Sequence, residues 1–305
     1  MTASSFDVVG IGENSVDFVY RLPGPPTPNT KLPVSAQRVL CGGQVATTLS
    51  TCAAFGLRAA YIGAFGNDEH GTRVREALAR RHVDTTHAVV RNAPNRYAVI
   101  LVDERTGDRT VVWERDPRLT LDQGDIPRAV VAAARLLHVD DVDVEASRAA
   151  ARMAADAGIP VTSDIDRTTD ATAALVACVT VPILAEHVPA ALTGEEDIEK
   201  ALRALRREHH RMLVVTLGTR GAMLLEGDRL HHVPAFEVDV VDTTGAGDVF
   251  RGALIYAMLR GDGPVEILRF ATAAAAVSCT REGAMDGVPT LEEVERVLAT
   301  KPTKN

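Results

Sequence analysis

Residues 240–253 read VVDTTGAGDVFRGA and join an apolar strand, through small residues, to a long helix rich in alanine and leucine. Gly245, Ala246 and Gly247 let backbone N–H groups approach a phosphate closely, and the following helix directs the positive end of its dipole to the same place. Asp248 begins that helix, where a carboxylate can accept the proton of an attacking hydroxyl or can simply cap the helix. The segment predicts an anion-binding turn, with both roles of Asp248 open.

Two further glycine-rich turns precede this segment. Residues 40–48, LCGGQVATT, place Gly42 and Gly43 between a strand and the start of a helix. Paired glycines allow the backbone to approach a polyol, and they also mark plain turns. Residues 214–222, VVTLGTRGA, end a buried strand in a turn that suits the phosphates of a nucleotide or a simple loop about equally.

Strand and helix patterns alternate along most of the chain. Strands are expected at 7–11, 59–62, 136–139, 161–163, 179–183 and 213–217, and helices at 44–55, 69–81, 146–157, 171–177 and 198–209. From residue 136 onward this alternation indicates parallel βαβ units. The fold class is therefore α/β.

Two segments, 15–41 and 96–115, break the alternation with strand patterns, a turn at 106–108 and no helix between the strands. They predict a small antiparallel lid over the carboxyl ends of the main sheet, where open α/β sheets bind ligands. We assign 15–41 and 95–115 to the lid, and 1–14, 42–94 and 116–305 to the body. The tail after residue 300 is expected to be disordered.

Composition excludes several classes of function. The chain has 305 residues, 46% hydrophobic and 24% charged, and a net charge of −8, which argues against a nucleic-acid partner. The sequence contains neither an apolar run of membrane-spanning length nor a signal-peptide pattern, so we expect a cytoplasmic protein with no membrane partner. The four cysteines lie far apart and are expected to be buried, reduced thiols.

Together and in this order, the three glycine-rich segments resemble the ribokinase-like, or phosphofructokinase-B, family of carbohydrate kinases over nearly the whole chain. Residues 242–248, DTTGAGD, are similar to the D-T-x-G-A-G-D signature of that family, which is highly specific in a strand-to-helix setting. The resemblance implies a three-layer α/β/α body with a small antiparallel β lid. It also implies Asp248 as the catalytic base, and Gly245, Ala246 and Gly247 as the anion hole for the transferred phosphate.

The resemblance implies further binding residues. Gly42 and Gly43 match the sugar-contacting glycine pair of the family, and Asp17 matches the acidic residue that holds sugar hydroxyls. The implied cofactors are ATP and Mg²⁺, and dependence on a monovalent cation is left open. The residues implied at the nucleotide are Thr216, Gly218 and Gly221 of the T-x-G-x-x-G turn, and Thr243 of the signature.

The sequence departs from the family pattern at two places. The asparagine usually found after the glycine pair is Thr47, so a hydroxyl contact is weakened or replaced. The N-x-x-E motif reads AEHV at 185–188, which leaves Glu186, one position along, as the candidate that organises Mg²⁺ through water. The ketohexokinase and sulfofructose kinase branches also lack the plain motif, and residues 234–250 look most like the latter branch.

The sequence gives little support to two other classes of nucleotide-binding protein. Gly10 and Gly12 follow a strand as in a dinucleotide-binding fingerprint, but serine replaces the third glycine, and no P-loop pattern is present. Within the family a nucleoside kinase stays open. From another class, a non-catalytic sugar or nucleotide sensor also stays open.

The reaction we expect is transfer of the γ-phosphoryl group of ATP to a primary hydroxyl of a ketose-like or related sugar. Asp17 and Asp141 should accept hydrogen bonds from its hydroxyls, and Lys31 or Arg96 should close the far end of the site. Asp143 falls where the sulfofructose branch has a sulfonate-binding arginine, so it should disfavour an anionic substrate. Unpaired edges of the lid favour a homodimer through the lid.

Overall fold

The computed structural model describes residues 5–106 and 109–299. Its body is built on a nine-stranded sheet with the order β15-β14-β13-β12-β11-β10-β1-β4-β6. Neighbouring strands from β6 to β13 pair in parallel, whereas β14 and β15 are added antiparallel. The strands are β1 (Phe6–Ile11), β4 (Ala59–Ile62), β6 (Val83–Asp84), β10 (Ala134–Asp140), β11 (Val161–Ile165), β12 (Val181–Ala185), β13 (Leu213–Thr216), β14 (Ala222–Glu226) and β15 (Arg229–Val233).

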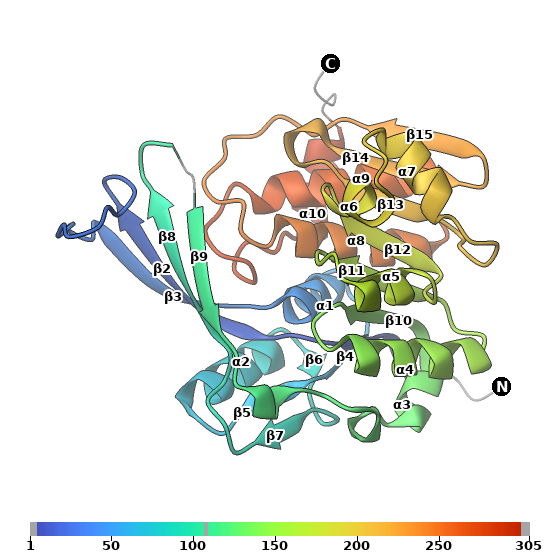
Figure 1. The fold of residues 1–305 in the computed structure, drawn as a ribbon, viewed down its shortest axis with the longest axis horizontal. Coiled ribbons are helices and arrows are strands. Elements are labelled where there is room, and N and C mark those ends of the chain that lie inside the picture. The colour runs from blue at the N-terminus through green and yellow to red at the C-terminus, as the bar shows by residue number, and fades with distance from the viewer. Residues whose placement is uncertain (1–4, 107–108, 300–305) are drawn as a thin grey trace.

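Helices cover both faces of the sheet (Figure 1). One face carries α3 (Arg128–Ala132), α4 (Val144–Asp156), α5 (Asp170–Val176), α6 (Val188–Thr193) and α7 (Ile198–Leu205). The other carries α1 (Gln44–Ala54), α2 (Glu69–Arg80), α8 (Ala246–Arg260) and α9 (Pro264–Ser278), with α10 (Leu291–Leu298) against α9.

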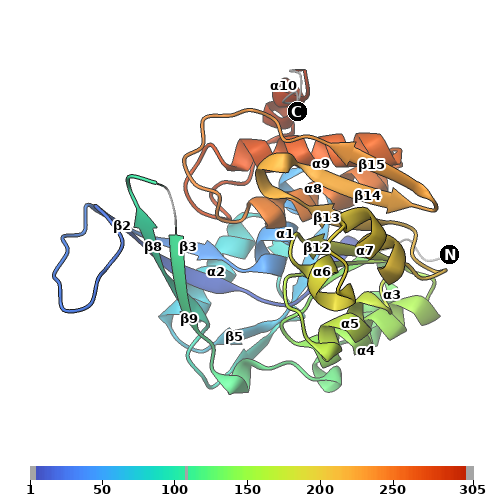
Figure 2. The same cartoon turned by 45° about the horizontal axis from the view of Figure 1, so that its top comes forward.

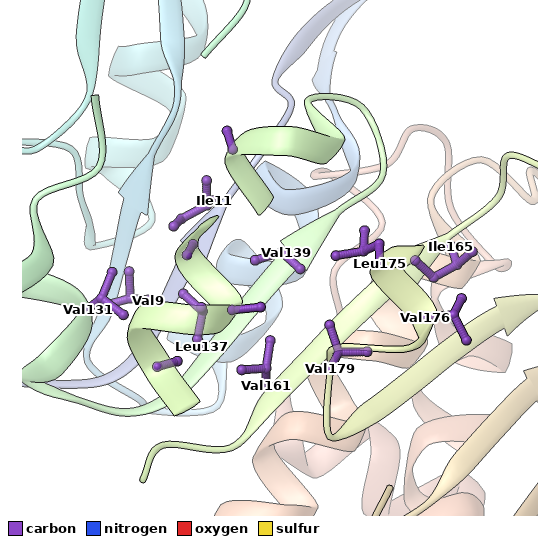
Figure 3. Packing of buried hydrophobic residues seen from close by; sticks show 14 of the residues in the cluster. Val9, Ile11, Val131, Leu137, Val139, Val161, Ile165, Leu175, Val176 and Val179 are labelled. Atoms are coloured by element: carbon purple, nitrogen blue, oxygen red, sulfur yellow. The ribbon is translucent and has the colours of Figure 1, made fainter. Parts of the chain in front are cut away.

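The core lies in two layers because successive strand side chains point to opposite faces. Val9 and Ile11 of β1 join the cluster under α4, whereas Val8 joins the cluster under α1. Figure 3 shows part of the first cluster, including Leu137 and Val161 of the neighbouring strands. The expected three-layer α/β/α body is thus confirmed.

A four-stranded lid stands off one side of the body (Figures 1 and 2). Its strands are β2 (Ser15–Leu22), β3 (Ala36–Gly42), β8 (Tyr97–Asp103) and β9 (Arg109–Glu114), in the order β3-β2-β8-β9. The pairs β2/β3 and β8/β9 are antiparallel, but the central pair β2/β8 is parallel because both strands run outward from the body. The lid is therefore mixed, and the residue limits that we assigned to it stay a prediction.

Two buried asparagines join the places where the lid strands leave the body. Asn95 Nδ2 donates to Asn14 Oδ1 at 3.0 Å, and Asn14 Nδ2 donates to the Tyr61 hydroxyl at 2.8 Å. Asn95 Oδ1 in turn accepts the N–H of Gly66 in β5 (Ala64–Gly66), which pairs with β7 (Val89–Arg91). Because these buried amides are satisfied by one another and by the body, they fix where the lid begins.

Some details of the chain differ from expectation. α7 ends at Leu205 rather than at residue 209, because Arg206 takes extended backbone angles and the His210 ring accepts the N–H of Arg207. Only Cys52 is fully buried, so the expectation of buried thiols is wrong for three partly buried cysteines, Cys41, Cys178 and Cys279. Residues 107–108 of the turn expected at 106–108, and the tail after residue 300, lie outside the described residues.

The outer strand of the lid carries exposed apolar side chains. Val111, Val112 and Trp113 of β9 are all exposed at an edge of the sheet. The homodimer through the lid stays a prediction. The exposed edge strand β9 is the surface through which we expect it to form. Of the helices in the described parts of the chain, none combines the length and the apolar character needed to cross a membrane.

Candidate active site

Polar residues follow or end five adjacent strands of the sheet. Because these strands are parallel, their carboxyl ends meet at one edge of the body, under the lid. The residues are Glu13 after β1, Asp140 at the end of β10, Asp164 in β11, Glu186 after β12 and Thr216 at the end of β13. This edge is where the site lies.

A cavity of about 180 Å³ lies between the lid and the carboxyl edge. It brings together five residues that the sequence singled out: Asp17, Gly43, Arg96, Gly245 and Asp248. They come from two lid segments, the start of α1 and the start of α8. The cavity also includes residues that sequence reasoning missed, among them Glu13, Ser15, Gln44 and Arg109.

Among the charged side chains of this cavity, Arg96 and Glu13 form an ion pair and Asp17 accepts a hydrogen bond. Ser15 Oγ donates to Asp17 Oδ1 at 2.5 Å, and burial raises the pKa of the Asp17 carboxyl group while this hydrogen bond opposes the rise. Arg96 Nε lies 2.9 Å from Glu13 Oε1, and Arg115 Nε lies 3.8 Å from the same oxygen. Burial raises the pKa of Glu13, and both arginines oppose that rise. The positive charge of Arg96 is therefore already compensated by a buried carboxyl group.

Several predicted substrate residues do not line this cavity. Lys31 is exposed in the loop between β2 and β3, and Gly42 ends β3 against the Asp17 carboxyl group. Thr47 is buried inside α1, and its hydroxyl has no hydrogen-bond partner among the described residues. Asp141 accepts the N–H groups of Asp166 and Arg167, so its carboxyl group supports the loop after β11.

Asp143 was expected to repel an anionic substrate, but its carboxylate is paired with other protein groups. Its Oδ2 accepts Arg115 Nη2 at 2.7 Å and the N–H of Leu121 at 3.1 Å. Asp143 does not line the cavity of about 180 Å³. A carboxylate that is paired with an arginine and buried beside backbone donors does not present free negative charge to a ligand. A preference for a neutral substrate would therefore have to come from other residues.

A second cavity, of about 410 Å³, lies next to the first. Phe236, Val238 and Phe250 contribute to its apolar lining. It contains all four residues predicted at the nucleotide: Thr216, Gly218, Gly221 and Thr243. Glycine-rich turns beside an apolar wall suit a ligand that has phosphates at one end and a base at the other.

The signature segment forms the wall between the two cavities. Thr244, Gly245 and Asp248 line the first cavity, whereas Thr243, Ala246 and Gly247 line the second. Gly245 has φ of 78°, and a Cβ there would lie 2.6 Å from the backbone of Ala284, so this turn requires glycine. A group transferred from one cavity to the other would pass along the backbone N–H groups at the start of α8.

Asp242 fixes this turn in place. Its carboxylate accepts the N–H of Thr244 at 2.9 Å and, from a separate loop, the N–H of Gly283 at 2.8 Å. From the sequence, Asp242 was expected only as the first residue of the signature, with no role of its own. The two hydrogen bonds show it to be the residue that joins the signature to the loop before α10.

Asp248 lies in the first turn of α8, partly buried, and its backbone oxygen accepts the Thr48 hydroxyl at 3.1 Å. Burial raises the pKa of Asp248 to about 7, and the charge of Arg251 opposes that rise. A carboxyl group with a pKa near neutrality can both take and release a proton at neutral pH, which is the property of a general base.

Arg109 is the functional candidate that sequence reasoning missed most clearly. It begins β9 of the lid and lines both cavities. Its Nη1 donates to the Thr243 hydroxyl at 2.8 Å and to the Thr244 hydroxyl at 3.1 Å. No local pattern marks this arginine, because its position over the signature results from the folding of the lid onto the body.

Glu186, the candidate for the metal, pairs with an arginine of the nucleotide turn. Its Oε1 lies 2.5 Å from Arg220 Nη2, and its side chain is half-exposed. Within 5–106 and 109–299 the structure contains no group of three or more His, Cys, Asp or Glu side chains that could hold a metal ion. Mg²⁺ commonly keeps several waters and binds through one or two carboxylates and the phosphates of a ligand. Glu186 fits only such a water-mediated role.

Two adjoining cavities separated by a glycine-rich turn at a helix start suit the transfer of a phosphoryl group, and comparison with known proteins identifies the family. The chain belongs to the pfkB family of carbohydrate kinases, whose pattern matches residues 5–291. The protein is thus a carbohydrate kinase, as the signature segment indicated.

Individual relatives agree with this assignment. Fructokinase-2 of Zea mays is 26% identical over 318 residues, covering 96% of this chain and 94% of the relative. A ribokinase of Haemophilus influenzae is 25% identical, covering 94% and 97%. The structure of a ribokinase from Thermotoga maritima superposes with a TM-score of 0.85 at 26% identity, covering 97% of this chain and 100% of that one. The ketohexokinase and sulfofructose kinase branch is not singled out and stays a prediction.

Proposed function

We propose that this carbohydrate kinase transfers the γ-phosphoryl group of ATP to a primary hydroxyl of a neutral, ketose-like sugar, with Asp248 as the general base. The observation that carries the proposal is the position of the signature segment as the wall between the two cavities. The smaller cavity suits the sugar and the larger one suits the nucleotide. In this arrangement the acceptor hydroxyl and the γ-phosphate meet at the start of α8.

Each residue then has a defined part in the transfer. Asp17 accepts hydrogen bonds from sugar hydroxyls, and Asp248 takes the proton of the attacking hydroxyl as the new O–P bond forms. The N–H groups of residues 245–247 stabilise the charge on the phosphoryl group in transit. Arg109 exchanges its threonine partners for phosphate oxygens. Mg²⁺ bound with ATP supplies further neutralisation of phosphate charge.

The charge of the sugar cavity favours a neutral substrate. Three carboxyl groups, Glu13, Asp17 and Asp248, face two arginines, Arg96 and Arg109. Arg96 is paired with Glu13, and Arg109 contacts the signature. An anionic tail would have to separate Arg96 from Glu13, leaving this buried carboxylate with only the more distant Arg115, 3.8 Å away.

Kinetics with charged and neutral acceptors test the substrate class. We expect kcat/KM to be higher for fructose-like sugars than for analogues that carry a terminal sulfonate or carboxylate. The measurement is ADP release at saturating ATP for each acceptor, with Glu13→Gln as the variant that should improve the anionic acceptors. A preference for the anions of more than about tenfold, roughly 1.4 kcal/mol, would contradict the proposed substrate.

A nucleoside kinase is less well supported by the cavity. A nucleobase is commonly bound by stacking on an aromatic ring. None of the described residues that line the sugar cavity is aromatic. Nucleosides belong in the same acceptor screen, and a non-catalytic sensor is excluded by any sugar-dependent release of ADP.

The metal role of Glu186 can be tested by titration. We expect Glu186→Gln to raise the Mg²⁺ concentration needed for half-maximal rate several-fold, because the amide weakens the hold on a metal-bound water. The matched control is Glu196→Gln, which removes an exposed carboxylate nearby in the sequence. If both variants follow the wild-type Mg²⁺ titration, Glu186 serves only as the partner of Arg220.

A further inference from the structure

Arginines from three lid strands lie on the inner face of the lid, the face that covers the site. Because side chains alternate along a strand, Arg21 of β2 points to the same side as the cavity residue Asp17. Arg38 of β3 lies diagonally opposite Arg21 on that face. Arg109 of β9 lies in the same row as Arg21, because both pair with Val102 of β8. The inner face thus presents guanidinium groups to the body.

One carboxylate of the body receives two of these arginines. Arg21 Nε and Nη2 lie 3.0 Å and 2.9 Å from Glu282 Oε1, and Arg38 Nε lies 3.5 Å from Glu282 Oε2. Glu282 is partly buried in the loop between α9 and α10. None of these three side chains lines either cavity. The ion cluster of Glu282, Arg21 and Arg38 therefore joins two lid strands to the body without touching the ligand sites.

The loop that carries Glu282 is itself fixed to the site. The next residue, Gly283, donates its N–H to Asp242 of the signature at 2.8 Å. The residue after it, Ala284, lines the smaller cavity and lies against Gly245 of the signature turn. Glu282 is thus anchored next to the signature on one side and bound to the lid on the other. A lid that moves away from the body has to break the ion cluster.

We propose that Glu282 is a positioning residue that holds the lid closed over the smaller cavity before the sugar binds. In the closed lid Asp17 shares this cavity with the start of α8, and Arg109 lies against the signature, so closure assembles both halves of the site. A protein whose binding-competent state is only partly populated binds its ligand more weakly in proportion to that fraction. Glu282 raises the closed fraction and with it the apparent affinity for the sugar. This inference rests on the proposed assignment of the smaller cavity to the sugar.

The kinetic consequence is a change in KM with little change in kcat. We expect Glu282→Gln to raise the KM for D-fructose about three- to tenfold, because the amide keeps the shape of the side chain but loses the charge that pairs with the lid. At saturating ATP and fructose the bound ligands themselves favour the closed lid, so kcat should change by less than about twofold. A lower kcat at unchanged KM would show that Glu282 only supports the signature turn, and would overturn the inference.

A double-mutant cycle tests whether the effect passes through the lid. Because Arg21 and Glu282 act through one contact, the double variant Arg21→Met/Glu282→Gln should raise the KM no further than Glu282→Gln alone. Additive effects would overturn the inference. The matched control is Arg281→Met, which removes an ion pair with Glu293 that joins the same loop to α10 and does not reach the lid. It should keep the wild-type KM.

The single tryptophan of the chain reports on the lid without turnover. Trp113 is half-exposed on the inner face of β9, opposite Ala98, which lines the smaller cavity. An open lid exposes this ring further, so acrylamide should quench its fluorescence more strongly in Glu282→Gln than in the wild type or in Arg281→Met. The measurement uses the full chain without ATP or sugar.

The two readouts separate the possible failures. Equal quenching of the wild type and Glu282→Gln would overturn the inference, because other contacts then hold the lid. Stronger quenching without a higher KM for fructose would support the contact between Glu282 and the lid, and would instead contradict the assignment of the smaller cavity to the sugar.

Discussion

We expect Asp248→Asn to keep the fold and the affinity for ATP but to lower kcat by about three orders of magnitude or more. The amide has nearly the shape of the carboxylate at the start of α8, but it cannot take the proton of the sugar hydroxyl. The measurement is ADP release at saturating ATP and sugar, with ATP affinity determined separately by calorimetry.

Asp239→Asn is the matched control for this variant. Asp239 is an exposed aspartate close to the signature in sequence, and it does not line either cavity. The control should turn over at nearly the wild-type rate. Near-normal turnover of Asp248→Asn would show that the carboxylate is a helix cap and that the proton leaves by another route.

Arg109→Ala should produce the second-largest loss, a decrease in kcat of about 10²–10³-fold, comparable to loss of one donor to a transition-state charge. In the structure its guanidinium donates to Thr243 and Thr244, on the two sides of the wall between the cavities. Arg109→Lys should recover only part of the rate, because an ammonium group cannot contact two oxygens in the same planar fork. The measurement is kcat at saturating ATP and sugar for each variant.

Arg105→Ala is the control for a lid arginine away from the site, since Arg105 pairs with Asp103 at the far end of β8. Like Arg109→Ala, the Arg105→Ala variant removes one positive charge from the lid. It should nevertheless leave kcat nearly unchanged. If Arg105→Ala and Arg109→Ala reduce kcat equally, the effect belongs to the general charge of the lid and not to a contact with phosphate.

The sequence was sufficient for features that are local. The alternation of strands and helices predicted the parallel body. These features depend on residues close in the chain, where turn chemistry and periodicity act directly.

Features that depend on tertiary contacts were not predictable in the same way. Asp141 and Asp143 were expected to face the substrate. A buried carboxylate needs hydrogen-bond donors, however, and backbone N–H groups and Arg115 supply them here. Arg251 of α8 and Asp164 of β11 form a buried ion pair although they lie far apart in the sequence. No pattern within either segment indicates such a partner.

Identification of the reaction product tests the central claim most directly. The purified protein is incubated with ATP, Mg²⁺ and a panel of neutral sugars, anionic sugars and nucleosides, and any phosphorylated product is analysed by ³¹P–¹H correlation NMR. We predict a new phosphate ester whose phosphorus couples to the protons of a CH₂ group of a neutral sugar, formed by the wild type and not by Asp248→Asn. A phosphate on a secondary carbon, or release of ADP without any phosphorylated acceptor, would contradict the account.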